Sequence, residues 1–237
     1  MITPAEKAFF LEHGYLLVEG ILQGEHLAAI SDAFNQVWET EHAPPCSQHQ
    51  LLKYRPFIDL IEHPPILERH RAIFGPQVQL LQYDLLRQGP RSEVPERNWH
   101  RDFSFPAERP LAINTILFLD DITPERGPTR VVPGSQRNES WPPQEMVHEP
   151  LEDEVAVLCP AGSAIFINAP IWHSGGRNAS DGLRRGIYLY YGYWWLKRYN
   201  AERELPWQAL EGASEQRLRL LGIKMPGRDL HMYDPAA

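Results

Sequence analysis

The chain has 237 residues, a mass of 27.3 kDa, 43% apolar residues and 23% charged residues. This length predicts one domain that is large enough to bury a core and keep a pocket inside it. No apolar run approaches the roughly 18 residues that a membrane span needs, so we expect no membrane partner. The net charge of −8, from 23 Lys and Arg against 31 Asp and Glu, argues against nucleic acid, because phosphate binding requires a basic face.

The N-terminal residues and the cysteines bear on location. The segment 1–7 lacks the basic-then-apolar order of a secretory signal, and the chain contains only Cys46 and Cys159. We therefore expect a reducing, cytoplasmic location.

Residues 1–75 are expected to form a mainly helical part. Thr3 and Glu6 flank a proline in a capping box, which predicts a short helix that Gly14 ends. Apolar residues at three-to-four spacing predict a longer amphipathic helix further on. The elements expected here are a strand at 15–18, a helix at 24–40, a polar loop at 43–49 and a helix at 65–74.

Short strands separated by turn residues are typical of residues 77–195. Because the helices precede these strands and do not alternate with them, a parallel sheet is not indicated, and a double-sheet jelly roll is the preferred architecture. A helical tail is expected over 200–237, with its helix at 206–221. The expected strands are 78–86, 111–119, 129–132, 155–158, 164–168 and 186–194.

A histidine and an aspartate stand two residues apart, at His100 and Asp102, and His173 follows far downstream. Side chains at i and i+2 of an extended segment point to the same side, so the first two can converge on one ion. Two imidazoles and one carboxylate on one face of a metal leave the opposite face open for chemistry. The alternative for the His-x-Asp pair is a surface ion pair or a turn cap.

His173 ends an apolar segment and precedes a glycine-rich turn, and Arg184 follows eleven residues later at the start of the next expected strand. A hairpin-like return would bring the guanidinium back near the histidine. In an apolar pocket, arginine is suited to bidentate capture of a carboxylate. The alternative is that Arg184 and Arg185 are solvated loop charges.

Four segments together resemble the phytanoyl-CoA dioxygenase family of Fe(II)- and 2-oxoglutarate-dependent oxygenases, and they cover most of residues 5–195. Arg126 and Gln136 stand where the family more often has Asn and His, and neither change touches a metal ligand. The segments are Trp-His-Arg-Asp-Phe-Ser-Phe-Pro at 99–106, Leu-Asp-Asp-Ile-Thr-Pro-Glu-Arg-Gly-Pro at 119–128 with Val-Val-Pro-Gly-Ser-Gln-Arg at 131–137, His173 with Asn178 and Arg184, and Phe-Phe-Leu-Glu-His-Gly-Tyr-Leu-Leu-Val at 9–18.

The resemblance implies a double-stranded β-helix, which is a cupin-like jelly roll, with Fe(II) as cofactor and 2-oxoglutarate and O2 as cosubstrates. It implies that His100, Asp102 and His173 are the metal ligands and catalytic residues, and that Arg184 binds the distal carboxylate of 2-oxoglutarate. Asn114 is the preferred candidate for a second contact to 2-oxoglutarate, because a carboxylate such as Asp84 is unsuited to a place beside another carboxylate.

The implied reaction is hydroxylation of an unactivated C–H bond in a small molecule, with release of succinate and CO2. Asp102 favours hydroxylation, since related halogenases carry a small residue at that position to admit a halide. Two alternatives are a zinc-dependent hydrolase with the same His-Asp-His set and a non-catalytic jelly-roll binding module. Substrate-covering loops are expected at 42–60, 88–98 and 138–152. We expect some of the aromatic residues near these motifs to line the substrate pocket, namely some of Trp99, Phe103, Trp172, Trp194 and Trp195.

Overall fold

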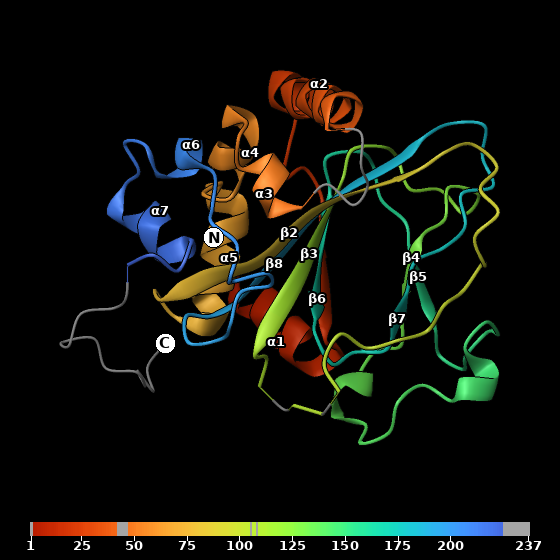
Figure 1. Cartoon of the computed structure of the whole chain (residues 1–237). Coiled ribbons are helices and arrows are strands. Elements are labelled where there is room, and N and C mark those ends of the chain that lie inside the picture. Colours follow the sequence, from red (N-terminus) through yellow and green to blue (C-terminus); the bar gives the residue numbers. More distant parts are fainter. Residues whose placement is uncertain (1, 42–46, 105, 108, 225–237) are drawn as a thin grey trace.

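Two antiparallel sheets form the centre of the molecule, with most helices on one side (Figure 1). The computed structural model describes residues 2–41, 47–104, 106–107 and 109–224. The larger sheet has the order β1 (Tyr15–Val18), β6 (Ala164–Asn168), β3 (Ala112–Phe118), β8 (Arg184–Tyr193) and β2 (Val78–Gln88). The smaller sheet has the order β5 (Val155–Val157), β4 (Thr129–Val131) and β7 (His173–Ser174).

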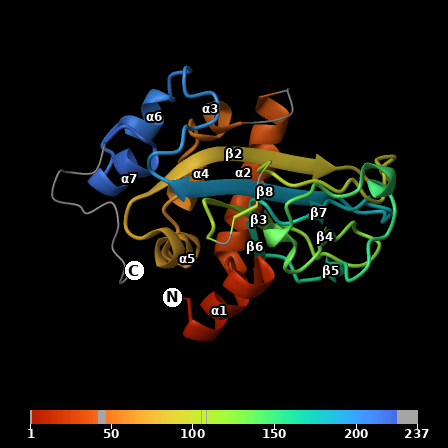
Figure 2. The same ribbon diagram turned by 90° about the horizontal axis from the view of Figure 1, so that it is seen from below.

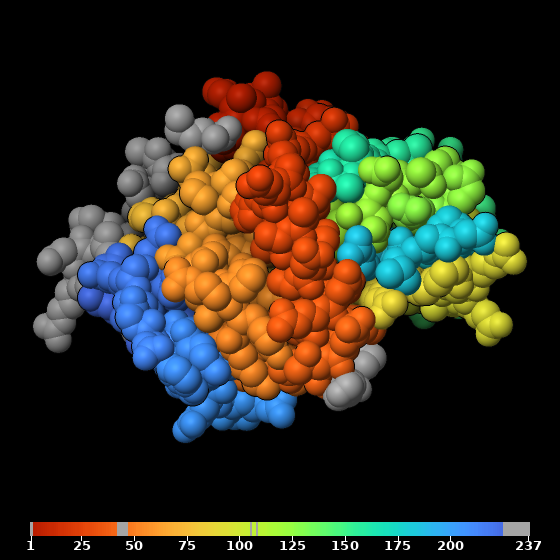
Figure 3. Space-filling model, turned by 90° about the horizontal axis from the view of Figure 1, so that it is seen from above, coloured from red at the N-terminus to blue at the C-terminus, as the bar shows by residue number. Residues whose placement is uncertain are grey.

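Helices cover one face of the larger sheet, and α2 crosses the molecule between the helix-rich side and the strand-rich side (Figure 3). The α-helices are α1 (Pro4–His13), α2 (Gly24–Thr40), α3 (Gln48–Leu51), α4 (Arg55–Leu60), α5 (Pro64–Phe74), α6 (Trp207–Leu210) and α7 (Glu215–Leu220), and the 3-10 helices are η1 (Ser135–Arg137) and η2 (Gln144–Met146). None of the described helices is both long and apolar enough to cross a bilayer.

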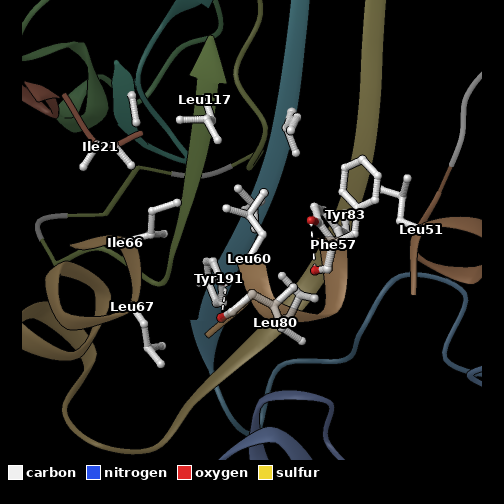
Figure 4. Packing of buried hydrophobic residues seen from close by; sticks show 14 of the residues in the cluster. Ile21, Leu51, Phe57, Leu60, Ile66, Leu67, Leu80, Tyr83, Leu117 and Tyr191 are labelled. Carbon is white, nitrogen blue, oxygen red and sulfur yellow. Dashed lines mark hydrogen bonds between the residues drawn. The ribbon is translucent and has the colours of Figure 1, made fainter. Parts of the chain in front are cut away.

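The main hydrophobic core lies between these helices and the larger sheet. Side chains of β2 and β8, which run side by side (Figure 2), pack there against α4 and α5. Two tyrosines of these strands donate hydrogen bonds to helix carbonyls, Tyr83 to Phe57 at 3.2 Å and Tyr191 to Ile61 at 2.9 Å (Figure 4). Polar hydroxyls therefore enter this core without an unsatisfied donor.

A second, smaller apolar cluster lies between the two sheets. Ile116 and Phe118 of β3 meet Val131 of β4 and Val157 of β5 there. The two sheets thus share an interior, as a jelly roll requires. The polar side chains described in the next subsection line another part of this interior.

Local signals in the N-terminal part act as the sequence predicts. The Thr3 hydroxyl accepts from the Glu6 amide at 3.1 Å, the Glu6 carboxylate accepts from the Thr3 amide at 2.6 Å, and Gly14 ends α1 with φ of 80°. Strands β1 and β6 have the predicted bounds, and the other predicted strands differ from the observed ones by two residues or fewer at each end.

Three predictions of secondary structure are wrong. The segment 47–60, expected to be loop, carries α3 and α4, while residues 42–46, including Cys46, lie outside the described residues. The helix predicted at 206–221 is two helices, because the chain turns at Gly212 with φ of 58°. His173 does not end the strand at 164–168 but begins β7 in the other sheet. The tail beyond residue 224 also lies outside the described residues.

Candidate active site

Three potential metal ligands meet where β7 pairs with the segment around residue 100. His100 and His173 exchange backbone hydrogen bonds of 3.0 and 2.9 Å, and the Asp102 amide donates to the Ala169 carbonyl at 2.9 Å. One ligand atom from each of His100, Asp102 and His173 lies within 4.8 Å of the other two. The structure therefore brings together the three residues that the sequence singled out.

The separations suit a shared ion. Asp102 Oδ1 is 3.9 Å from His100 Nε2 and 3.7 Å from His173 Nε2. Ligand atoms that each lie about 2.1 Å from one ion are about 3 to 4 Å apart, so little movement is needed to bind one.

The hydrogen bonds of the two imidazoles select the tautomer that binds metal. Nδ1 of His100 lies 2.8 Å from the Asn98 carbonyl, and Nδ1 of His173 lies 3.0 Å from the Ile171 carbonyl. A carbonyl can only accept, so each Nδ1 carries the proton and each Nε2 presents a lone pair towards Asp102. Burial, and then the neighbouring His173, lower the pKa of His100, which favours the neutral imidazole.

Arg101, which separates two of the ligands in sequence, anchors this segment. Its guanidinium is buried and donates to the carbonyl of Pro170 at 3.1 Å and to that of Asn138 at 2.9 Å. Because Arg101 fixes the backbone between His100 and Asp102, the two ligand side chains hold their positions before any ion binds.

A cavity of about 370 Å³ opens beside Asp102. This volume is typical of a site for a small molecule. Tyr190 lies next to Asp102, and burial, followed by the charge of Asp102, raises the pKa of Tyr190 far above its ordinary value, so its phenol stays protonated. The lining residues are Leu81, Gln82, Asp84, Asp102, Phe103, Asn114, Tyr188, Tyr190, Leu196, Lys197 and Tyr199.

Arg184 begins β8 and shares its face with Tyr188 and Tyr190, since alternate residues of a strand point the same way. The residue is 1% exposed, its guanidinium carbon lies 6.0 Å from the centre of the Phe118 ring, and its Nε and Nη2 have no hydrogen-bond partner among the described residues. A buried guanidinium without an anion is costly, so this position suits the carboxylate of a ligand. The interpretation of Arg184 as a solvated loop charge is wrong, because the residue is buried.

Several lining residues were not predicted from the sequence. Alternate residues of β8 point to the same face, so Tyr188 and Tyr190 point inward with Arg184. This period of two could have predicted both tyrosines as lining residues. Gln82 faces the cavity because of the register between β2 and β8, which the sequence alone does not give, whereas Asp84 is already a candidate by position in the sequence.

The predictions of which loops and aromatic residues line the pocket are mostly wrong. No described residue of 42–60, 88–98 or 138–152 lines the cavity, which the segment 196–199 closes instead. Within 88–98, Arg97 forms an ion pair of 2.6 Å with Glu154, which lies just beyond the predicted loop 138–152. Phe103 alone of the five candidate aromatic residues lines the cavity. Trp99 is buried and donates to the Glu149 carbonyl at 2.9 Å, and Trp195 is 53% exposed.

The two antiparallel sheets and the cluster of two histidines and one carboxylate place this protein in the class of jelly-roll proteins with a site for a single metal ion. The family model described as phytanoyl-CoA dioxygenase matches residues 10–186, and the chain belongs to that family.

The chain is also similar to individual proteins. A relative from Emericella variicolor, dioxygenase andF, is 32% identical over 128 residues, which are 53% of this chain and 41% of that protein. The solved structure of the non-heme alpha ketoglutarate dependent carbocyclase SnoK from nogalamycin biosynthesis has a TM-score of 0.67 at 22% identity, covering 81% of this chain and 84% of that chain. HygX from Streptomyces hygroscopicus, with nickel and 2-oxoglutarate bound, has a TM-score of 0.70 at 16% identity, covering 84% and 90%. These likenesses confirm the predicted jelly roll.

Proposed function

We propose that this chain is a dioxygenase that depends on Fe(II), 2-oxoglutarate and O2 and hydroxylates an unactivated C–H bond of a small molecule. Succinate and CO2 are the other products. The observation that carries the proposal is the convergence of His100, Asp102 and His173 on one point beside a cavity, in a member of the phytanoyl-CoA dioxygenase family. Family membership favours this function over a zinc-dependent hydrolase and over a non-catalytic binding module.

The three side chains would hold the iron. Their donor atoms are one carboxylate oxygen and two imidazole nitrogens whose tautomers are already set, which is the donor set of mononuclear Fe(II) oxygenases. When bound, iron(II) and 2-oxoglutarate supply the oxidation, in which O2 gives one oxygen atom to the substrate carbon and the other to succinate. Tyr190 lies next to Asp102, and its hydroxyl, which has no hydrogen-bond partner among the described residues, would donate to Asp102 or to a ligand beside it.

Arg184 would bind the distal carboxylate of 2-oxoglutarate through its unpartnered nitrogens. Asn114 pairs with Tyr190 in the register of β3 and β8, six residues along β8 from Arg184, which is about 20 Å at about 3.3 Å per residue. We therefore assign Asn114 to the metal end of the cavity, where it would contact the substrate, because 2-oxoglutarate held at Arg184 is a five-carbon chain much shorter than this separation.

Hydroxylation is the outcome that the ligand set favours. Asp102 occupies the place that a halide would need, so halogenation is not proposed. A cytoplasmic location is proposed from the use of cysteine, since Cys159 is a free, buried thiol whose pKa burial raises to about 11. Such a thiol stays protonated and unreactive.

The test is conversion of 2-oxoglutarate to succinate by the full chain with Fe(II) in air. We expect succinate to form with iron and not after chelation, and Asp102→Ala to abolish it. Asp181→Asn, which changes a carboxylate that is 81% exposed, is the matched control and should leave turnover unchanged. Succinate formation that persists in Asp102→Ala would contradict the proposed function.

A further inference from the structure

We propose that the substrate carries a protonated amine, and that the Asp84 carboxylate binds it inside the cavity. The inference rests on the proposed function in one respect, which is that the cavity beside Asp102 holds the substrate. The recognition of an amine is a separate property of the cavity wall, and it can be measured without turnover.

Asp84 is a carboxylate that lines the cavity and forms no ion pair with a cation among the described residues. It lies on β2 opposite Tyr188 of β8 and lines the same cavity as Asp102. Its side chain accepts a hydrogen bond from the Gln82 amide, and no ion pair between described residues includes it. Burial raises the pKa of Asp84, as expected for a carboxylate that lacks a positive partner. A cationic ligand would relieve this cost.

Lys197 does not supply that charge. It lines the cavity from the segment after β8, its side chain is exposed, and it makes no ion pair with a described carboxylate. The carboxylate on β2 is therefore available to a ligand that enters past Lys197.

Asn114 provides a second, independent indication of the ligand. It is 9% exposed and lines the cavity, and its buried Oδ1 has no donor among the residues that the structure describes. The wall thus presents acceptors, the Asp84 carboxylate and the Asn114 carbonyl oxygen, that protein donors do not saturate. An ammonium group has only donors to offer, so it matches such a wall. A carboxylate or phosphate placed directly at Asp84 would meet a like charge there.

Aromatic rings complete the arrangement. Phe103, Tyr188, Tyr190 and Tyr199 all line the cavity. The negative face of an aromatic ring attracts a cation, most strongly where water is excluded. The carboxylate, the amide oxygen and the aromatic rings favour the same class of ligand, a small molecule with a protonated nitrogen on an apolar frame.

The experiment compares two probes of nearly equal shape, cyclohexylamine, which is cationic at pH 7.5, and cyclohexanol, which is neutral. Each is titrated by calorimetry into the full chain loaded with nickel(II) and 2-oxoglutarate, so that Asp102 is occupied as a ligand. We expect the amine to bind at least about tenfold more tightly than the alcohol. In Asp84→Asn the ratio of the affinity for the amine to that for the alcohol should fall to near one. Asp181→Asn should retain the wild-type ratio.

Equal affinity of the wild type for the two probes would overturn the proposal, whatever the stability of the variants. A preference that survives in Asp84→Asn would overturn the assignment to Asp84, and Asp84→Glu, which keeps the charge, should retain part of the preference. The titrations are repeated in EDTA without 2-oxoglutarate. Failure of the proposed function would appear as a lack of nickel and 2-oxoglutarate binding, and the comparison in EDTA would still decide the role of Asp84.

Discussion

The two faces of strand β8 carry opposite kinds of surface. On the face towards the helices, Leu189 and Tyr191 are fully buried, and the Tyr191 hydroxyl has a carbonyl partner. On the interior face, Arg184 is just as buried, but two of its nitrogens have no hydrogen-bond partner in the described part of the chain. A single ten-residue strand therefore contributes to the stable core and to the candidate active site.

The difference shows where a ligand is expected. On the helix-covered face, folding pairs the buried tyrosine hydroxyls with helix carbonyls, whereas the interior face keeps polar groups that a ligand can satisfy. Substitutions on the two faces should consequently separate stability from function.

The largest expected effect is on the interior face, at Arg184. Arg184→Met is expected to raise the KM for 2-oxoglutarate about 1000-fold, because the distal carboxylate would lose a buried, charged partner. Without 2-oxoglutarate, the variant should be as stable as the wild type or more stable, since it removes an unpaired buried charge. Steady-state succinate assays and thermal unfolding measure the two effects.

The neighbouring Arg185 is the matched control. It lies on the other face and pairs with Asp120 at 2.7 Å, so Arg185→Met should leave the KM unchanged. An equal rise in KM for both variants would contradict the division between the two faces.

A smaller effect, on stability alone, is expected for the helix-covered face. Leu189→Ala should lower the free energy of unfolding by about 3 kcal/mol, because it removes a fully buried side chain from the core. Urea unfolding measures the loss. The KM for 2-oxoglutarate of the folded variant should not change, and a large rise would show that the two faces are coupled.

The smallest effect concerns pH and His70, which is fully buried on α5 with its Nε2 2.9 Å from the Thr115 hydroxyl. Burial lowers the pKa of His70 to about 3. Below about pH 6.5 the unfolded chain binds a proton there that the folded chain does not, so stability falls as the pH falls. Between pH 7.5 and 5 the wild type should lose about 2 kcal/mol through this residue.

His70→Gln, which does not titrate, should lack that part of the pH dependence. Urea unfolding at the two pH values, compared between wild type and variant, measures the difference. If the free energy of unfolding changes equally between the two pH values in both proteins, His70 does not control the acid stability.

The sequence predicts most of the ligand set and less of the cavity. His100 and Asp102 are predictable because an i, i+2 spacing needs only a locally extended chain. His173 is predictable as a ligand, but its strand of two residues is too short to show a period. The place of Gln82 in the cavity wall depends on register between strands distant in sequence, which no local pattern specifies. The single-domain organisation stays a prediction.

The most direct test of the central claim is an anaerobic titration of the chain with Fe(II) in the presence of 2-oxoglutarate, followed by the visible charge-transfer absorption of iron(II) chelated by a keto acid. The wild type is predicted to bind one iron per chain and to develop this band, and Asp84→Asn is predicted to do the same. Asp102→Ala is predicted to develop no band. A band of full intensity in Asp102→Ala would contradict the assignment of His100, Asp102 and His173 as the iron site.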